Sequence, residues 1–186
     1  MPPKTRKTAG PAPTTAQSLA SLVKSARDIM RKDKGLNGDL DRLPLLTWIM
    51  FLKFLDDLEL QRAEEAKLSG KKFRSAVEPP YRWRDWAANP QGITGDELLS
   101  FINQDETTRP DGKRGSGLFA YLRGLTSDNG DDRREVIATV FRGVDNRMKS
   151  GYLLRDVVNE TPHGRGSALY VHDLDTGVTA DSRELR

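Results

Sequence analysis

The sequence contains no cysteine, and its two histidines, His163 and His172, both lie within the last 24 of 186 residues. The first absence excludes disulfide bonds, thiolate zinc sites and cysteine nucleophiles. Because no histidine precedes His163, the body of the chain also cannot hold a histidine-based catalytic or metal site. These two absences disfavour a small enzyme.

Long apolar runs are also absent. The most apolar stretch, Leu43–Leu55, has 13 residues and includes Lys53, whereas a membrane-spanning helix needs roughly 20. Residues 1–13 are basic and rich in proline but have no apolar segment of the kind found in signal peptides. We therefore expect a cytoplasmic protein with no membrane partner, in which residues 1–15 form a flexible arm.

The charge is nearly balanced over the whole chain but not along it. Thirty basic and 27 acidic side chains give a net charge of +3, with a pI of about 9.2. Residues 1–74 alone carry 15 basic and 9 acidic groups. This excess permits nucleic-acid binding without demonstrating it.

The clearest pattern in the sequence is helical periodicity. A first amphipathic helix follows Thr15, with one apolar face made by Leu19, Leu22, Val23, Ala26, Ile29 and Met30. A second helix begins at Asp39 or Asp41, with Pro44 in its first turn. Its residues 45–60 are apolar with few polar breaks, so we predict a helix that is buried on most sides, at the centre of a helical bundle. Past Asp57 we expect the helix to be solvated.

The rest of the chain predicts shorter helices and no substantial sheet. Residues 71–95 contain Pro79-Pro80, Asn89-Pro90 and Gly92, which exclude long elements. Short helices are expected in four places, namely 97–103, 117–125, from Asp131 or Asp132, and 150–160. We therefore predict a mostly α fold: a helical-bundle domain over 16–160, followed by an irregular, unstructured tail over 161–186.

Three motifs were weighed for chemistry. Glu78-Pro-Pro-Tyr81 is reminiscent of the turn that holds a flipped base in amino-group DNA methyltransferases, but a glutamate is one methylene too long, which favours an ordinary proline turn. Residues 112–117 are rich in glycine, yet no strand leads into them, so a polar surface loop is favoured over a phosphate cradle. The adjacent pairs Asp56-Asp57 and Asp131-Asp132 diverge on a helix and indicate caps and surface charge.

Basic and aromatic residues alternate in residues 81–86, as they do on nucleic-acid-binding surfaces. One interpretation is that Trp83 and Trp86 pack onto the long helix while the arginines pair with Asp85 or solvent. The other is a DNA-binding patch, for which the candidates are Lys71, Lys72, Arg74, Arg82 and Arg84. A solvated run of charge is an equal alternative for this cluster.

Four segments carry a resemblance to a known family: LPLLTWIMFLKFLDD (43–57), YRWRDWA (81–87), TGDEL (94–98) and MKSGYLLRDVV (148–158). In this order, over about residues 18–160, the chain resembles the N-terminal helical domain of the modification (M, HsdM) subunit of type I restriction–modification enzymes. The resemblance implies a domain that contacts DNA and other subunits: a second M subunit, a specificity subunit and a restriction subunit. In that family a following domain binds S-adenosylmethionine and methylates adenine N6.

No catalytic residue of the family can be assigned to this sequence. The family's glycine-rich cofactor loop and its Asn-Pro-Pro-Phe turn are both missing, so we expect no cofactor in this chain and no methylation by it alone. After Glu160 the family pattern stops, and we expect residues from about 161 onward to be foreign to the family. The leading hypothesis is a DNA- and subunit-interaction domain without the catalytic domain. The alternative is a freestanding helical nucleic-acid-binding regulatory protein.

Overall fold

A computed structural model describes residues 15–127 and 132–161. Seven helices and one small hairpin follow in the order α1 (Thr15–Met30), α2 (Asp39–Leu68), α3 (Trp83–Trp86), α4 (Gly95–Asn103), β1 (Glu106–Thr108), β2 (Arg114–Ser116), α5 (Leu118–Arg123), α6 (Asp132–Phe141) and α7 (Gly151–Glu160). The predicted mostly α fold is confirmed. The proposed arm (1–15) and tail (161–186), including both histidines, lie outside the described residues except for Thr15, the first residue of α1, and Thr161.

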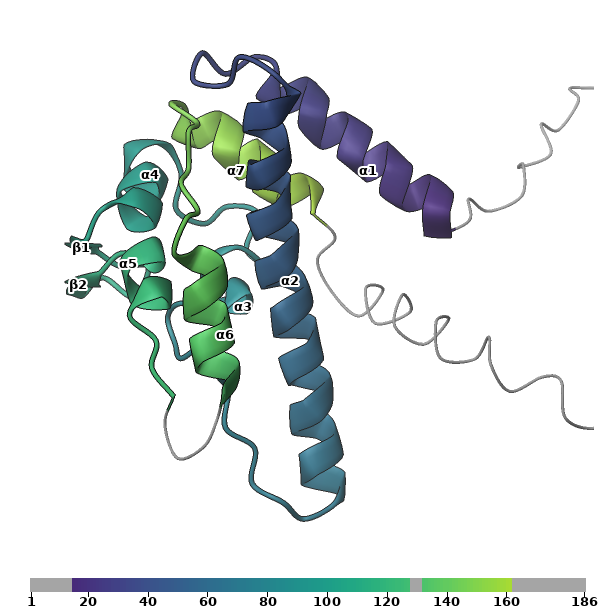
Figure 1. The fold of residues 1–186 in the computed structure, drawn as a ribbon, viewed down its shortest axis with the longest axis vertical. Helices are drawn as coiled ribbons and strands as arrows, with labels where there is room; N and C mark the ends of the chain where they lie inside the picture. The colour runs from purple at the N-terminus through teal and green to yellow at the C-terminus, as the bar shows by residue number, and fades with distance from the viewer. Residues whose placement is uncertain (1–14, 128–131, 162–186) are drawn as a thin grey trace, which may run out of the picture.

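Helix α2 runs the length of the domain, and the shorter helices α3 to α6 gather along one side of it (Figure 1). Helix α1 diverges from its upper end and packs against α7. Helix α2 begins at Asp39, the earlier of the two predicted starts, so Pro44 lies inside the helix and not in its first turn. The carboxylates of Asp39 and Asp41 in the first turn interact favourably with the positive end of the helix dipole.

The core forms where these helices meet. Among its largest fully buried side chains are Trp48, Trp86, Phe101 and Phe141. The rings meet edge to face: Trp48 lies 5.2 Å from Phe119, and Trp86 lies 5.8 Å from Phe101, measured between ring centroids. Edge-to-face contacts of this kind stabilise a core beyond the area that they bury.

The prediction that α2 is buried on most sides is wrong. Leu45, Ile49 and Leu52 are buried on one side of the helix, but Phe54 and Leu58 on another are 46% and 37% exposed. The physical reason is that helices α3 to α6 gather along one side of α2, so a helix with apolar residues all round leaves some of them in solvent.

Two carboxylates of α2 are buried although both were expected at the surface, Asp56 as part of a surface pair and Glu59 in the solvated part of the helix. Asp56 is 5% exposed and Glu59 is 2% exposed, because segments that follow α2 in the chain fold back over this side of the helix. Both carboxylates are satisfied by polar partners from these segments, as a buried charge requires. Surface charge therefore does not explain Asp56.

A two-stranded antiparallel hairpin was not predicted. Glu106 pairs with Ser116 and Thr108 with Arg114, so the glycine-rich segment favoured as a surface loop contains a strand. Gly112 lies in the connecting turn with φ of 78°, a conformation that favours glycine. Strands of three residues are too short to show alternation in a sequence. Within the described ranges, no helix is long and apolar enough to cross a membrane.

Two close approaches fix α7 in the bundle. A Cβ atom on Gly151 would lie 1.8 Å from the carbonyl oxygen of Gly95, so only glycine allows α4 and α7 to come this near. The guanidinium of Arg155, which is 4% exposed, donates hydrogen bonds to the carbonyl oxygens of Trp86, Ala87 and Ile93. These bonds tie α7 to the segment that connects α3 and α4.

Candidate nucleic-acid interface

The first three candidate residues lie together beyond the end of α2. Lys71, Lys72 and Arg74 are exposed, and they belong to a segment that leaves the lower end of the helix and turns back toward the bundle (Figure 1). We refer to residues 71–74 as the 71–74 loop. The end of α2 is marked by Gly70, with φ of 65°. The loop therefore presents the cations of Lys71 and Lys72 to solvent at one end of the domain, together with Arg74, which is exposed and also pairs with Glu78 at 3.4 Å.

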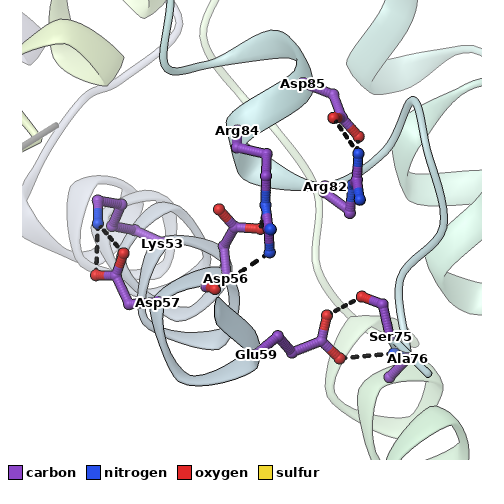
Figure 2. A network of polar contacts seen from close by, with 9 residues as sticks. All are labelled: Lys53, Asp56, Asp57, Glu59, Ser75, Ala76, Arg82, Arg84 and Asp85. Carbon is purple, nitrogen blue, oxygen red and sulfur yellow. Dashed lines mark hydrogen bonds and ion pairs between the residues drawn. The ribbon is translucent and has the colours of Figure 1, made fainter. Parts of the chain in front are cut away.

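A buried carboxylate anchors the residues that follow the loop. Glu59 accepts a hydrogen bond from the hydroxyl group of Ser75, and its other oxygen accepts one from the backbone N–H of Ala76 at 2.6 Å (Figure 2). Because Glu59 is 2% exposed, these bonds form away from solvent and are strong. They fix the position at which the 71–74 loop leaves the surface of α2.

Two arginines of α6 join the same region, and the sequence analysis missed them. The Arg133 guanidinium donates to the carbonyl oxygen of Arg74 at 3.1 Å and lies 5.6 Å from the centroid of the Phe73 ring. Arg134 donates to the carbonyl oxygen of Ala76 at 3.3 Å. No signal in the sequence links positions nearly 60 residues apart, although both arginines stand in the first turn of a predicted helix. Arg133 adds a cation to the base of the 71–74 loop.

The other two candidates are partly buried, and each pairs with a carboxylate of the protein. Arg84 Nε lies 2.9 Å from Asp56 Oδ1, and Arg82 forms two hydrogen bonds of 2.8 and 2.9 Å with the carboxylate of Asp85 (Figure 2). The tryptophans between them, Trp83 and Trp86, are buried. The interpretation that the tryptophans pack while the arginines pair is therefore confirmed, but the partner of Arg84 is Asp56, which was not foreseen.

The ionisation of these groups reflects their surroundings. Burial raises the pKa of Asp56 above its usual value of 3.8, and the hydrogen bond from Arg84 only partly offsets the increase. The hydrogen bond to Asp85 raises the pKa of Arg82. A nearby carboxylate thus balances the charge of each arginine, and this weakens the electrostatic attraction between the arginine and an external phosphate.

The acidic side chains nearby do not converge on a catalytic or metal site. Asp57 pairs with Lys53 at 2.5 Å, while the neighbouring Asp56 faces Arg84, so the two carboxylates diverge as expected (Figure 2). In the part of the chain that the structure describes, no three acidic or histidine side chains form a group suited to a metal ion. The chemistry of this region is that of charge and hydrogen bonding.

Comparisons with known proteins show the family of the chain. Residues 19–160 match the sequence model of the HsdM N-terminal domain. Over 144 residues the chain is 41% identical to the type I restriction enzyme EcoEI methylase subunit of Escherichia coli, a match that covers 77% of this chain and 26% of that protein.

A solved structure is similar as well. It is the crystal structure of a protein assigned as a modification subunit of a type I restriction enzyme from Vibrio vulnificus YJ016, with 61% identity and a TM-score of 0.79. The alignment covers 96% of this chain and 39% of that one, and so extends beyond residues 19–160. The hypothesis that residues from 161 onward are foreign to the family gains no support from it. The chain belongs to the HsdM N-terminal domain family of type I restriction-enzyme modification subunits.

Proposed function

We propose that this domain contacts the phosphate backbone of DNA for a type I restriction–modification methyltransferase subunit. The observation that carries the proposal is the 71–74 loop, whose cations are exposed while Glu59 and Arg133 fix its base. Lysine and arginine side chains that reach phosphates give affinity and position without reading base sequence. Sequence recognition would then belong to a specificity subunit, as in the family that the chain resembles.

The methylation reaction is assigned to a separate domain of the subunit. The chain spans about a quarter of the E. coli relative and 39% of the Vibrio chain. Within this sequence there is neither a glycine-rich cofactor loop after a strand nor an Asn-Pro-Pro-Phe turn. S-adenosylmethionine and the target adenine are therefore ligands of the catalytic domain, and this domain works in the cytoplasm by holding DNA for it.

The same domain offers a surface for other subunits. Leu43, Phe54 and Leu58 share one face of α2 by helical spacing, and each is more than one-third exposed. Apolar side chains gathered on one surface are typical of protein interaction sites. We assign this surface to contacts with M, specificity or restriction subunits. Introduction of negative charge by Phe54→Asp with Leu58→Asp should abolish co-purification with those subunits while leaving DNA binding unchanged.

Binding to duplex DNA tests the proposal. Fluorescence anisotropy with three unrelated 20-bp duplexes should give dissociation constants that agree within about twofold and that rise steeply with salt, because counterions are released at each phosphate contact. A preference of more than about tenfold for one duplex would favour the alternative, a freestanding regulator that reads a defined site. No binding to any duplex at low salt would overturn the proposal.

A further inference from the structure

A second group of cations forms at the opposite end of α2. Lys32 and Lys34 lie in the connection between α1 and α2, and Lys149 directly precedes the N-terminus of α7. All three are exposed. We refer to these residues as the Lys32/Lys34/Lys149 cluster. Nothing in the sequence pattern brings position 149 near positions 32 and 34, so the cluster exists only in the folded chain.

A buried aspartate brings the two segments together. The carboxylate of Asp33, which is 4% exposed, accepts hydrogen bonds from the backbone N–H groups of Gly35, Lys149 and Ser150 at 2.8 to 3.1 Å. The segments are also in direct contact, because a Cβ atom on Gly35 would lie 2.9 Å from Lys149 Cγ. The three lysines therefore lie beside the contact that Asp33 makes between the two segments.

The positive charge of the three lysines is only partly balanced by acidic groups around them. The arginines around them have acidic partners: Arg31 pairs with Asp28, and Arg147 pairs with Asp41. Asp33 is closest in the chain, and the single negative charge of its carboxylate, which backbone N–H groups hold in place, offsets only one of the three lysines. None of the three lysines forms an ion pair within residues 15–127 and 132–161. The positive electrostatic potential of the three lysines therefore extends into the solvent.

We propose that the Lys32/Lys34/Lys149 cluster binds the phosphodiester backbone of duplex DNA, as a second contact beyond the 71–74 loop. The inference rests on the proposed function. Lysine ammonium groups are compact point charges that suit phosphates and do not select bases. Both positively charged regions then hold one duplex, and α2 sets the distance between them.

The length of α2 sets the shortest duplex that can reach both positively charged regions. Its 30 residues span about 45 Å at a rise of 1.5 Å per residue. The 71–74 loop lies at the lower end of the helix and the connection between α1 and α2 at the upper end (Figure 1). At about 3.4 Å per base pair, a duplex must have about 13 base pairs to reach both regions. Shorter duplexes can occupy only one of them.

The test compares three variants of the full chain by fluorescence anisotropy on a 24-bp duplex across a salt series. In the first, Lys32, Lys34 and Lys149 are changed to alanine; in the second, the same change is made at Lys71, Lys72 and Arg74. The control removes three exposed cations elsewhere, Lys24, Lys113 and Arg142. The first variant should bind at least about fivefold more weakly than the control, and its log–log salt slope should fall by about 2 to 3.

Duplex length supplies a second readout. The parent chain should lose affinity on duplexes shorter than about 13 base pairs, whereas the variant that lacks the cluster should bind short and long duplexes equally. The conservative variant with arginine at all three positions should restore the parent behaviour. Circular dichroism and thermal melts verify that each variant is folded, which is expected because only exposed side chains change.

The outcomes separate this proposal from the one on which it rests. If the 71–74 loop variant is weakened while the cluster variant equals the control, the second contact is overturned and the proposed function stands. If the parent shows no salt-dependent binding, both proposals fail. Weakened cluster binding with no dependence on duplex length would contradict the bridging of one duplex.

Discussion

Asp56 on α2 and Arg84 on α3 form an ion pair with 2.9 Å between Oδ1 and Nε, and the carboxylate side chain is only 6% exposed. This pair holds α3 against the long helix and turns toward the interior an arginine that the sequence had indicated for DNA. The cations of residues 71–86 thus form two groups. Arg82 and Arg84 pair with Asp85 and Asp56. Lys71, Lys72 and Arg74 are exposed to solvent.

Removal of Arg84 should destabilise the domain. In Arg84→Ala the carboxylate of Asp56 stays buried without its cation, so we expect a loss of about 2–3 kcal/mol in the free energy of unfolding, measured by urea denaturation. The matched control is Arg82→Ala. Its partner Asp85 is more accessible, and its loss should be below about 1 kcal/mol.

The same variant should show a defined pH dependence. Burial raises the pKa of Asp56 in the folded state above the usual 3.8, so its ionisation opposes folding as the pH rises through the interval between the two values. Without Arg84 this pKa rises further. The destabilisation of Arg84→Ala relative to the parent should therefore be larger at pH 7 than near pH 3.8, where protonation removes the buried charge. Equal losses at both pH values would show that Asp56 is not the affected group.

Asp33 should be essential for the docking of α7. Replacement by asparagine leaves one accepting oxygen where the carboxylate has two, and the backbone N–H groups of Lys149 and Ser150 lose a charged partner. We expect a loss of about 2–3 kcal/mol and faster amide hydrogen exchange at these two residues. Asp28→Asn, which breaks only an exposed ion pair, should change stability by less than about 0.5 kcal/mol. Unchanged exchange in the Asp33 variant would refute this role.

The two sides of α2 should respond differently to truncation. Leu52 is 3% exposed and Phe54 is 46% exposed. Leu52→Ala should cost about 2–5 kcal/mol through lost burial and the cavity left behind, whereas Phe54→Ala should cost less than about 1 kcal/mol because that ring is already half in water. Chemical denaturation of the two variants measures the difference. Similar losses would mean that the outer side of α2 is packed after all.

The contact between α4 and α7 should not tolerate a side chain at Gly151. Gly151→Ala places a methyl group against the carbonyl of Gly95, and the helices must separate. We expect a loss of about 3 kcal/mol, at the upper end for overpacking, observed as a lower melting temperature. Gly143→Ala, at a position with open space around it, serves as the control. A Gly151 variant as stable as this control would contradict the close approach.

Much of the helical framework could be predicted from local pattern. The limits of α4, α5 and α7 follow from apolar spacing and from breakers such as Gly117 and Gly124, which act over a few residues. Trp83 and Trp86 were correctly interpreted as packing residues, since large rings between charged neighbours bury their surface when a helix is nearby.

The remaining features depend on contacts between distant segments. The pairings of Asp56 with Arg84 and of Asp33 with Lys149 join positions 28 and 116 residues apart, and no local periodicity contains them. The exposed side of α2 was missed for a related reason. The apolar residues of a helix indicate that it can be buried, but the number of neighbouring helices decides how much of the helix surface they cover. The contact between Arg133 and the 71–74 loop was missed for the same reason, because it joins positions 59 residues apart.

The central claim is that DNA is bound by the exposed cations of the 71–74 loop and not by Arg82 and Arg84, which are partly buried and paired with Asp85 and Asp56. The most direct test is the salt dependence of duplex binding by the variant with alanine at Lys71, Lys72 and Arg74, compared with Arg82→Ala. The account predicts that the triple variant loses about 2 to 3 from the log–log salt slope, uniformly across sequences, while Arg82→Ala keeps the parent slope. A triple variant that binds like the parent, or an Arg82 variant that loses as much, would contradict it.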